Sequence, residues 1–422
     1  MERVAILGFG CAGFHCAKAL REVDFTGEIH IFDPSNLPPA NPMLTTYYTA
    51  GKLPYEKLFP FGTLAQLTEQ YRLQVHPLAA VRLAAQDRCV HLSDGTTQVF
   101  EKILLSTGAH PFVPPLPKLP AKAVYYMRTP ADACRLRERL QRGDVRHAVV
   151  IGASMAGVKV AELLVNAGAD CLLADLAPQM FPLAALPQVA QEIHRRVEAF
   201  GVQLQFGVGL TGVQEAGQGL SVQLGEQTQK TDLLVLCIGT RPNLELLDAS
   251  EIAIDRGVVV DEQQQTSVHG IYAAGDCCAG NNLQSKQKQV LGLWANAGYQ
   301  GRAAGYAMAG VPLPYAGTMP HNLTHFMGMD FIGFGNVHAQ GELFSYRHPD
   351  GAYRLDAVLD GDQPVCVNIL DNYAISGAIK NEMMRRFLGA EGPTAPMQRV
   401  ALLRAGLPLE ILERLEGAYE HQ

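Results

Sequence analysis

The sequence lacks three features that would assign a protein class at once: a basic block, a long apolar run and C-x2-C cysteine pairs. Only 18% of its 422 residues are charged, the net charge is −7, and no dense block of lysine and arginine occurs. Attraction to nucleic acid or to anionic lipid therefore has little support. No run of 18 apolar residues is present, so we expect no membrane-spanning segment.

The cysteines argue against the common metal sites. Nine are scattered along the chain, and none forms a C-x2-C pair, the spacing that zinc and iron-sulfur sites use. The chain starts MERVAILGFG, without the apolar stretch and cleavage site of a signal peptide. We therefore expect reduced thiols and a cytoplasmic protein.

What the sequence does contain is a repeated α/β design. The segment VAILGFG is followed by an alanine-rich helical stretch over about residues 12–21 and then by EIHIFD. The same order recurs in HAVVIGASMAGVKVAELL and DCLLAD. Strands that alternate with helices in this way predict parallel sheets. The expected fold class is α/β with two Rossmann-like dinucleotide-binding domains.

The stretch LGFGCAGFHC has two incompatible interpretations. Its glycines form G-x-G-x-x-G, in which Gly8 permits a tight turn, Gly10 lets the backbone approach a pyrophosphate and Gly13 allows close packing of the helix. Asp33 ends the next strand, where a carboxylate can accept hydrogen bonds from ribose hydroxyls. Its cysteines, however, form C-x4-C, which is a possible spacing for a redox disulfide.

The second α/β unit carries a related cradle, G-x-S-x-x-G, formed by Gly152, Ser154 and Gly157. The serine hydroxyl in the middle position can bind phosphate. Asp175 closes the next strand, and no arginine follows it in ADLAPQM to meet a 2′-phosphate. This pattern favours NADH over NADPH.

Two hinge-like segments divide the chain. KILLSTGAHP at 102–111 and DLLVLCIGTRPN at 232–243 are apolar strands that end in a glycine turn and a proline. We expect the chain to leave one domain and to re-enter it at these points. Beyond YAGTMPHNL the pattern changes to alternating strands, YRLDAVLD and PVCVNILD, closed by an amphipathic helix in PLEILERLEGAY. This last part is predicted to be an α+β domain.

Several motifs in order resemble the FAD-dependent pyridine nucleotide-disulfide oxidoreductase superfamily. They are the two cradles, the STGAHP and IGTRPN hinges, and GVVVDEQQQTSVHGIYAAGDCC at 257–278. The resemblance implies that the first unit binds FAD, that the second binds NAD(P)H, and that Asp276 holds the ribityl chain. LWANAGYQGRAAG at 293–305 is similar to the ferredoxin, rubredoxin and putidaredoxin reductase branch.

By this resemblance, residues 1–112 and 234–318 form an FAD-binding domain, and 113–233 form an NAD(P)H-binding domain inserted in it. Residues 319–422 form a C-terminal α+β interface domain, which often mediates dimers, so we expect a homodimer. The resemblance also implies cofactor contacts at further positions: Ala12, Asn41, Thr107, Gly108, Gly239, Gly275 and Trp294.

The choice between cradle and disulfide can be argued from geometry. On a helix, Cys11 and Cys16 would lie about 140° apart with poorly matched Cβ directions. In the disulfide-reducing members of the family, the reactive pair follows the cradle, whereas the corresponding stretch 40–62 contains no cysteine. Flavin is then the only redox centre that the sequence displays. Cys277 and Cys278 next to Asp276 are either packed or reactive, and both interpretations stay open.

Three departures from the branch bear on the mechanism. Asn41 and Thr46 stand where the branch has an arginine and a lysine, the lysine being expected close to flavin N5. Lys159 stands where a glutamate is usual near the nicotinamide. We hypothesise that Lys159 stabilises negative charge at the reduced flavin or attracts an anionic substrate; the alternative is a solvated lysine. Trp294 is expected near the flavin and nicotinamide, with core packing as the alternative.

Two smaller signals have several interpretations. His321 and His325 are four residues apart, which on a helix could bind a metal, contact a substrate or pack in an interface, although no third ligand is evident. The run SKQKQ at 285–289 is either a solvated surface or a docking site for an acidic redox protein.

The favoured function is hydride transfer from NADH to FAD, followed by delivery of electrons to a carrier protein such as ferredoxin or rubredoxin. A small organic molecule or oxygen is the alternative acceptor. A flavin-binding regulatory module without turnover is a third hypothesis.

Overall fold

The computed structural model describes residues 2–116, 119–120, 123–217, 219–248, 251–390 and 394–416. They fold into two compact units. The first comprises Met1–Phe112, Arg128–Cys134 and Thr240–Thr318; the second comprises Val113–Met127, Arg135–Gly239 and Met319–Gln422. No helix among the described residues is both long and apolar enough to cross a membrane.

The first unit is built on a five-stranded sheet in the order β20-β7-β1-β2-β3, and all its neighbouring strands are parallel. Apart from the edge strand β3, the strands are mainly apolar and largely buried, as expected when both faces of a parallel sheet are covered. They are β1 (Arg3–Leu7), β2 (Glu28–Phe32), β3 (Leu73–His76), β7 (Lys102–Leu105) and β20 (Ile271–Ala273).

Helices α1 (Cys11–Glu22) and α7 (Trp294–Met308) pack against each other in this unit. Glycine permits their close approach, because a Cβ on Gly301 would lie only 2.1 Å from the Ala12 carbonyl oxygen. The other elements are η1 (Pro42–Leu44), α2 (Thr45–Thr49), η2 (Tyr55–Leu58), α3 (Leu64–Tyr71), β4 (Ala80–Ala84), β5 (Cys89–Leu92), β6 (Thr97–Val99), β8 (Ala109–Pro111), β17 (Thr240–Pro242), β18 (Ile254–Asp255), β19 (Gly257–Val259), β21 (Cys278–Asn281) and β22 (Lys288–Gln289).

The second unit contains another parallel five-stranded sheet, in the order β12-β11-β10-β16-β9. Helices α5 (Met155–Asn166) and α6 (Pro187–Phe200) pack against its strands. The strands are β9 (Val124–Tyr125), β10 (His147–Ile151), β11 (Asp170–Asp175), β12 (Val202–Phe206) and β16 (Leu233–Leu236). A three-stranded antiparallel sheet consists of β13 (Leu210–Ala216), β14 (Gly219–Leu224) and β15 (Gln227–Thr231). Helix α4 (Pro130–Gln141) spans the boundary between the units.

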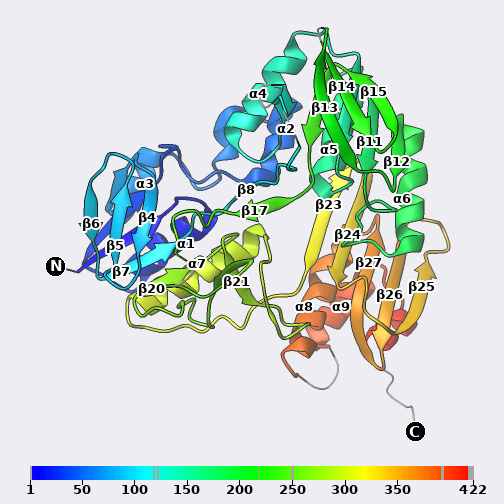
Figure 1. Ribbon diagram of the computed structural model, residues 1–422. Helices are drawn as coiled ribbons and strands as arrows, with labels where there is room; N and C mark the ends of the chain where they lie inside the picture. The colour runs from blue at the N-terminus through cyan, green and yellow to red at the C-terminus, as the bar shows by residue number, and fades with distance from the viewer. Residues whose placement is uncertain are drawn as a thin grey trace. The chain divides into compact units, whose positions relative to one another are not determined.

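The C-terminal part of the second unit is an antiparallel five-stranded sheet in the order β23-β24-β27-β26-β25, with α8 packed on β27 (Figure 1). Its elements are β23 (His321–Phe326), β24 (Met329–Gly335), β25 (Glu342–Arg347), β26 (Arg354–Asp360), β27 (Gln363–Leu370), η3 (Tyr373–Ile375), α8 (Ser376–Phe387), α9 (Pro396–Arg404) and α10 (Leu409–Leu415). The predicted fold class is confirmed: two Rossmann-like domains, one inserted in the other, and a C-terminal α+β domain. The domain limits at 112, 234 and 318 and the homodimer stay predictions.

The histidine pair does not lie on a helix. His321 and His325 are both on strand β23, where residues four apart are separated by about 13 Å, so one metal ion cannot bind both. No group of three or more potential metal ligands occurs in the described ranges. The helical interpretation of this spacing was wrong because β24 pairs with the segment along its whole length. The expected closing helix ends at Leu415 as α10, and residues 417–422 lie outside the described ones.

Candidate functional site

The first cradle has the geometry that its glycines predict. Gly8 has a φ of +102°, and a Cβ there would lie 2.4 Å from the Ser106 carbonyl oxygen. A Cβ on Gly13 would lie 2.3 Å from the Gly8 carbonyl oxygen. Gly10, which precedes α1, differs because a Cβ there would meet no heavy atom within 4 Å. The space in front of the helix N-terminus is therefore open, which suits an anionic group.

Asp33 is tied to the cradle by its own carboxylate. Its Oδ2 accepts a hydrogen bond from the Phe9 amide at 2.7 Å, and its Oδ1 accepts one from the Ser35 hydroxyl at 2.6 Å. The carboxylate thus fixes the turn that contains Gly8 and Gly10. The Ser35 amide also donates to Oδ1 at 2.9 Å. Because a carboxylate can accept about four hydrogen bonds, Asp33 can still accept one further donor.

The second cradle repeats this arrangement with one change. Gly152 has a φ of +108°, and a Cβ on Gly157 would lie 1.8 Å from the Gly152 carbonyl oxygen. Ser154 is the N-cap of α5: its hydroxyl accepts the Gly157 amide at 3.2 Å and donates to the Cys237 carbonyl at 2.9 Å. The Ser154 hydroxyl was expected to bind a phosphate, but its only proton is already donated to the Cys237 carbonyl.

Asp175 has the same role in this cradle as Asp33 in the first. Its Oδ2 accepts the Ala153 amide at 2.6 Å and its Oδ1 accepts the Ala177 amide at 2.8 Å. The next side chain, Leu176, is 72% exposed. No basic side chain occurs between residues 176 and 186, so the loop offers no cation for a 2′-phosphate.

Thr46 provides a test of whether the first unit is complete without a ligand. The residue is only 8% exposed, and among the described residues its hydroxyl has no hydrogen-bond partner. A buried hydroxyl without a partner is costly. Asn41 stands five residues before it and caps η1 through a bond from the Met43 amide at 3.0 Å. The unpartnered hydroxyl fits a site that a bound group completes.

Asp276 forms a close ion pair with Arg128, which sequence reasoning missed. Both side chains are mostly buried and both belong to the first unit. The adjacent Gly275 is held by the side chain of Gln300, whose Oε1 accepts the Gly275 amide at 3.0 Å. A Cβ on Gly275 would lie 3.2 Å from the Ala12 Cβ. The ion pair and the buried amide fix Asp276 beside the N-terminal turn of α1.

The two hinges meet within the first unit. Strands β8 and β17 pair there antiparallel, and the Thr107 hydroxyl donates to the Asn243 carbonyl at 2.8 Å. The Gly108 carbonyl accepts a hydrogen bond from the backbone N–H of Asn243 at 3.0 Å. Gly239 lies between β16 and β17 and has a φ of +99°, which a residue with a side chain adopts only with strain.

Trp294 begins α7 and stacks on an aromatic neighbour. Its ring lies 5.8 Å from that of Phe61 at an angle of 10°, and Phe61 stacks on Phe14 at 4.1 Å. The Trp294 carbonyl accepts a hydrogen bond from the Cys11 thiol at 3.4 Å. The side chain is only partly buried, so this packing leaves part of the tryptophan accessible.

The thiols are not arranged for redox chemistry. All nine cysteines are free. Burial raises the pKa of Cys11 to about 12, and it raises the pKa of Cys277 and of Cys278 as well. A thiol with a raised pKa is a poor nucleophile at neutral pH because little thiolate forms. The disulfide interpretation of residues 7–16 is thereby wrong, and the packed interpretation of Cys277 and Cys278 is favoured.

The remaining candidates lie on α5 and in the C-terminal part. Lys159 is partly buried on α5 in the second unit. His321 bonds to the Met319 carbonyl and to Lys380 Nζ, each at 3.0 Å, and burial lowers its pKa to about 4. His325 bonds to Asp330 at 2.8 Å. In the 285–289 segment, Lys288 bonds to the Val260 carbonyl.

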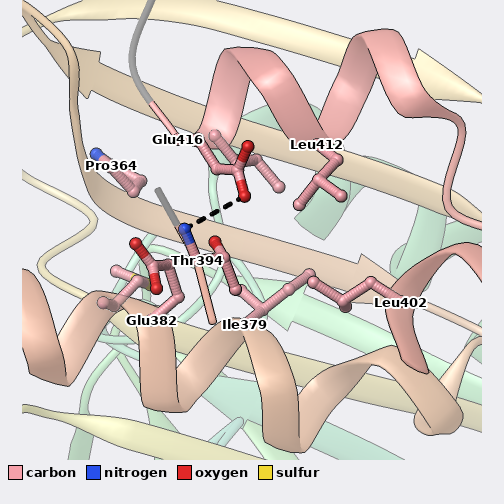
Figure 2. A pocket seen from close by; sticks show the side chains of 9 residues that line it. Pro364, Ile379, Glu382, Thr394, Leu402, Leu412 and Glu416 are labelled. Carbon is pink, nitrogen blue, oxygen red and sulfur yellow. Dashed lines mark hydrogen bonds between the residues drawn. The ribbon is translucent and has the colours of Figure 1, made fainter. Parts of the chain in front are cut away.

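A small pocket in the C-terminal part does not suit a cofactor (Figure 2). Its two buried carboxylates are already neutralised: Glu382 pairs with Arg385 at 2.6 Å, and Glu416 pairs with Arg399. The other side chains that line it are mostly apolar: Pro364, Ile379, Met383, Thr394, Leu402, Leu412 and Leu415. The pocket therefore belongs to the packing of α8, α9 and α10.

Comparison with known proteins places these features in a family context. A sequence model described as pyridine nucleotide-disulphide oxidoreductase matches residues 2–301. Subunit epsilon of the NADH-dependent phenylglyoxylate dehydrogenase of Aromatoleum evansii is 29% identical over 90% of this chain and 91% of that protein. The rubredoxin-NAD(+) reductase of Pseudomonas putida is 28% identical over 79% and 86%. The ferredoxin reductase structure from Rhodopseudomonas palustris has a TM-score of 0.80 at 24% identity, covering 88% and 91%.

Proposed function

Because the chain belongs to the pyridine nucleotide-disulphide oxidoreductase family, we propose that it takes reducing equivalents from NADH onto FAD and passes them to an electron-carrier protein. The observation that carries this proposal is the pair of complete cradles, each with its glycines and its carboxylate, in a chain whose thiols are unpaired. The redox chemistry is that of FAD when it is bound, which accepts hydride and releases electrons.

We propose that the first unit holds FAD. Gly10 leaves room for the pyrophosphate at the N-terminus of α1, and Asp33 accepts ribose hydroxyls. Asp276, oriented by Arg128, holds the ribityl chain. The unpartnered hydroxyl of Thr46 contributes a hydrogen bond to the flavin.

Trp294 supplies a direct test of this assignment, because it is the only tryptophan in the chain. We propose that its ring lies near the flavin, with Thr107, Gly108, Gly239 and Gly275 supporting the cofactor-binding loops. Titration with FAD should then quench the fluorescence of Trp294. Emission that does not change as FAD binds would argue for core packing alone.

The preference for NADH over NADPH rests on Asp175, whose charge would repel a 2′-phosphate. We predict that Asp175→Asn combined with Leu176→Arg reverses the preference. The asparagine keeps one acceptor for the backbone amides, and the exposed arginine supplies a cation. The ratio of kcat/KM for NADPH over NADH should rise by about 100-fold or more, since a charge-assisted pair replaces a repulsion.

Leu183→Arg is the matched control for that experiment. Leu183 is 78% exposed and lies in the same loop, so this variant adds one arginine charge at another position and keeps the Asp175 carboxylate. A reversal of preference by Leu183→Arg would show that net charge alone decides, and the role of Asp175 and Leu176 would be refuted.

Lys159 is proposed to stabilise the negative charge that develops at the flavin on reduction. We predict that Lys159→Met slows flavin reduction by NADH about tenfold or more, whereas Lys159→Arg retains most of the rate. Stopped-flow absorbance under anaerobic conditions measures this step. An unchanged rate in Lys159→Met would remove the residue from the mechanism.

The same stopped-flow assay on Thr46→Val and Thr46→Ser tests the role of the Thr46 hydroxyl.

A second candidate function follows from one relative. Because the match to the phenylglyoxylate dehydrogenase subunit spans nine-tenths of both chains, we also propose a second role for the chain, as the NAD(H)-linked subunit of a larger dehydrogenase. Purification from its native source separates the two: a stable complex with other subunits supports this candidate, and a chain purified alone supports the free reductase.

The main proposal is tested by mixing the flavin-loaded protein with NADH without oxygen. The flavin absorbance should bleach within seconds, and addition of ferredoxin, rubredoxin, a quinone or oxygen should restore it. Fastest reoxidation by a carrier protein supports the proposal, whereas fastest reoxidation by oxygen or a quinone supports the alternative acceptor. A protein that takes up no FAD, or whose flavin NADH does not reduce, would refute the function.

A further inference from the structure

The loop that follows Asp175 closes on the second cradle. Ala177 donates its amide to Asp175, and the Phe181 amide donates to the Ala153 carbonyl at 2.9 Å. The Ala153 amide in turn donates to Asp175 at 2.6 Å. Ala153 lies between Gly152 and Ser154 in the turn of the second cradle. Because Phe181 is bonded to Ala153, a shift of Phe181 would also shift this turn.

The far end of this loop is held by the C-terminal sheet. Asn368 on β27 is 1% exposed, and its side chain bonds to the loop twice. Its Oδ1 accepts the Leu186 amide at 2.7 Å, and its Nδ2 donates to the Ala184 carbonyl at 2.9 Å. On the neighbouring strand β24, a Cβ at Gly333 would lie 2.8 Å from that carbonyl. Asparagine and glycine together let the loop lie directly on the sheet.

An aromatic cluster fixes the middle of the loop. The Phe181 ring stacks on Phe331 at 5.0 Å and contacts the edge of Phe326 at 5.5 Å. Phe181 has a φ of +49°, a left-handed conformation that is unfavourable for a bulky residue. Burial against the two phenylalanines of the sheet stabilises that conformation.

We propose that the C-terminal sheet is part of the NADH site, and that Asn368 is a positioning residue that sets the second cradle through the loop 176–186. This inference rests on the proposed function. The contacts run from Asn368 to Ala184 and Leu186, from Phe181 to Ala153, and from Ala153 to Asp175, all within the second unit. The C-terminal part would then serve cofactor binding as well as any interface.

The test is the affinity for NADH in Asn368→Ala, measured by NADH fluorescence and by steady-state kinetics with ferricyanide as acceptor. Removing the amide leaves two buried backbone groups of the loop without partners. The Kd and KM for NADH should rise about tenfold, while kcat and the FAD content change less than about twofold. A merely structural defect would lower kcat and FAD content together.

Two further variants keep the test decisive. Asn372→Ala is the control, because the Asn372 amide bonds to the Ala405 carbonyl at 3.2 Å in the same C-terminal part; it should leave the Kd unchanged. If Asn368→Ala does not fold, Phe331→Leu removes the stacking partner of Phe181 and should also raise the Kd. An unchanged Kd for NADH in the folded variants would overturn the inference. Binding of NADH to the wild type without flavin reduction would refute only the proposed function.

Discussion

Gly13→Ala is expected to destabilise the first unit before any cofactor binds, whereas Gly10→Ala is expected to leave the fold intact and to weaken FAD binding. A methyl group on Gly13 would lie 2.3 Å from the Gly8 carbonyl oxygen and 3.1 Å from the Ile6 side chain. Because backbone cannot move away cheaply, α1 must shift from β1. We expect a loss of about 3 kcal/mol or more in the free energy of unfolding.

Gly10→Ala should behave in the opposite way. Gly10 has an ordinary φ of −84°, and a methyl group there meets no heavy atom within 4 Å. The free energy of unfolding of the flavin-free protein should change by less than about 0.5 kcal/mol. The methyl group would project into the space where the pyrophosphate must approach, so the Kd for FAD should rise about tenfold or more.

Urea unfolding of the flavin-free variants and titration with FAD measure the two effects separately. Unchanged FAD affinity in Gly10→Ala would mean that the open space at α1 is not the pyrophosphate site. Equal loss of stability in both variants would mean that the two glycines do not have different roles.

The sequence predicted the parts of this protein that depend on local pattern. Both cradles, the strands before them and the carboxylates after them follow from glycine spacing and apolar runs, because these features are set by residues close together in the chain. The carboxylates illustrate the limit. Asp33 was predicted to meet ribose and Asp175 to favour NADH, but their bonds to the amides of Phe9 and Ala153 became visible only in the fold.

What the sequence could not predict are contacts between distant residues. Arg128 pairs with Asp276 across 148 positions, and no local motif connects an arginine before α4 with an acid after β20. Asn368 likewise reaches the loop at Ala184 from 184 positions away. His321 shows the reverse error, since a four-residue spacing has a meaning on a helix that it loses on a strand.

Asp356→Ala should be among the most destabilising substitutions in the second unit. Asp356 is 0% exposed and accepts bonds from Arg354 at 2.8 Å, from the Ser345 hydroxyl at 2.6 Å and from Gln188 at 3.2 Å. Alanine would leave the buried Arg354 without its main counter-charge. Breaking a buried ion pair on one side costs about 3–5 kcal/mol, so the midpoint of urea unfolding should fall strongly.

The double variant Arg354→Met with Asp356→Leu separates charge from packing. Replacing a buried ion pair by apolar residues of similar volume is often neutral, so the double variant should recover most of the stability that Asp356→Ala loses. Asp360→Ala, at the exposed end of the same strand, is the control and should change stability by less than about 0.5 kcal/mol. Since Gln188 lies in the first turn of α6 in the dinucleotide fold, loss of Asp356 should lower the unfolding midpoint of both parts of the unit in one transition. Separate transitions, with the parallel sheet unaffected, would show that the C-terminal sheet does not support the dinucleotide fold.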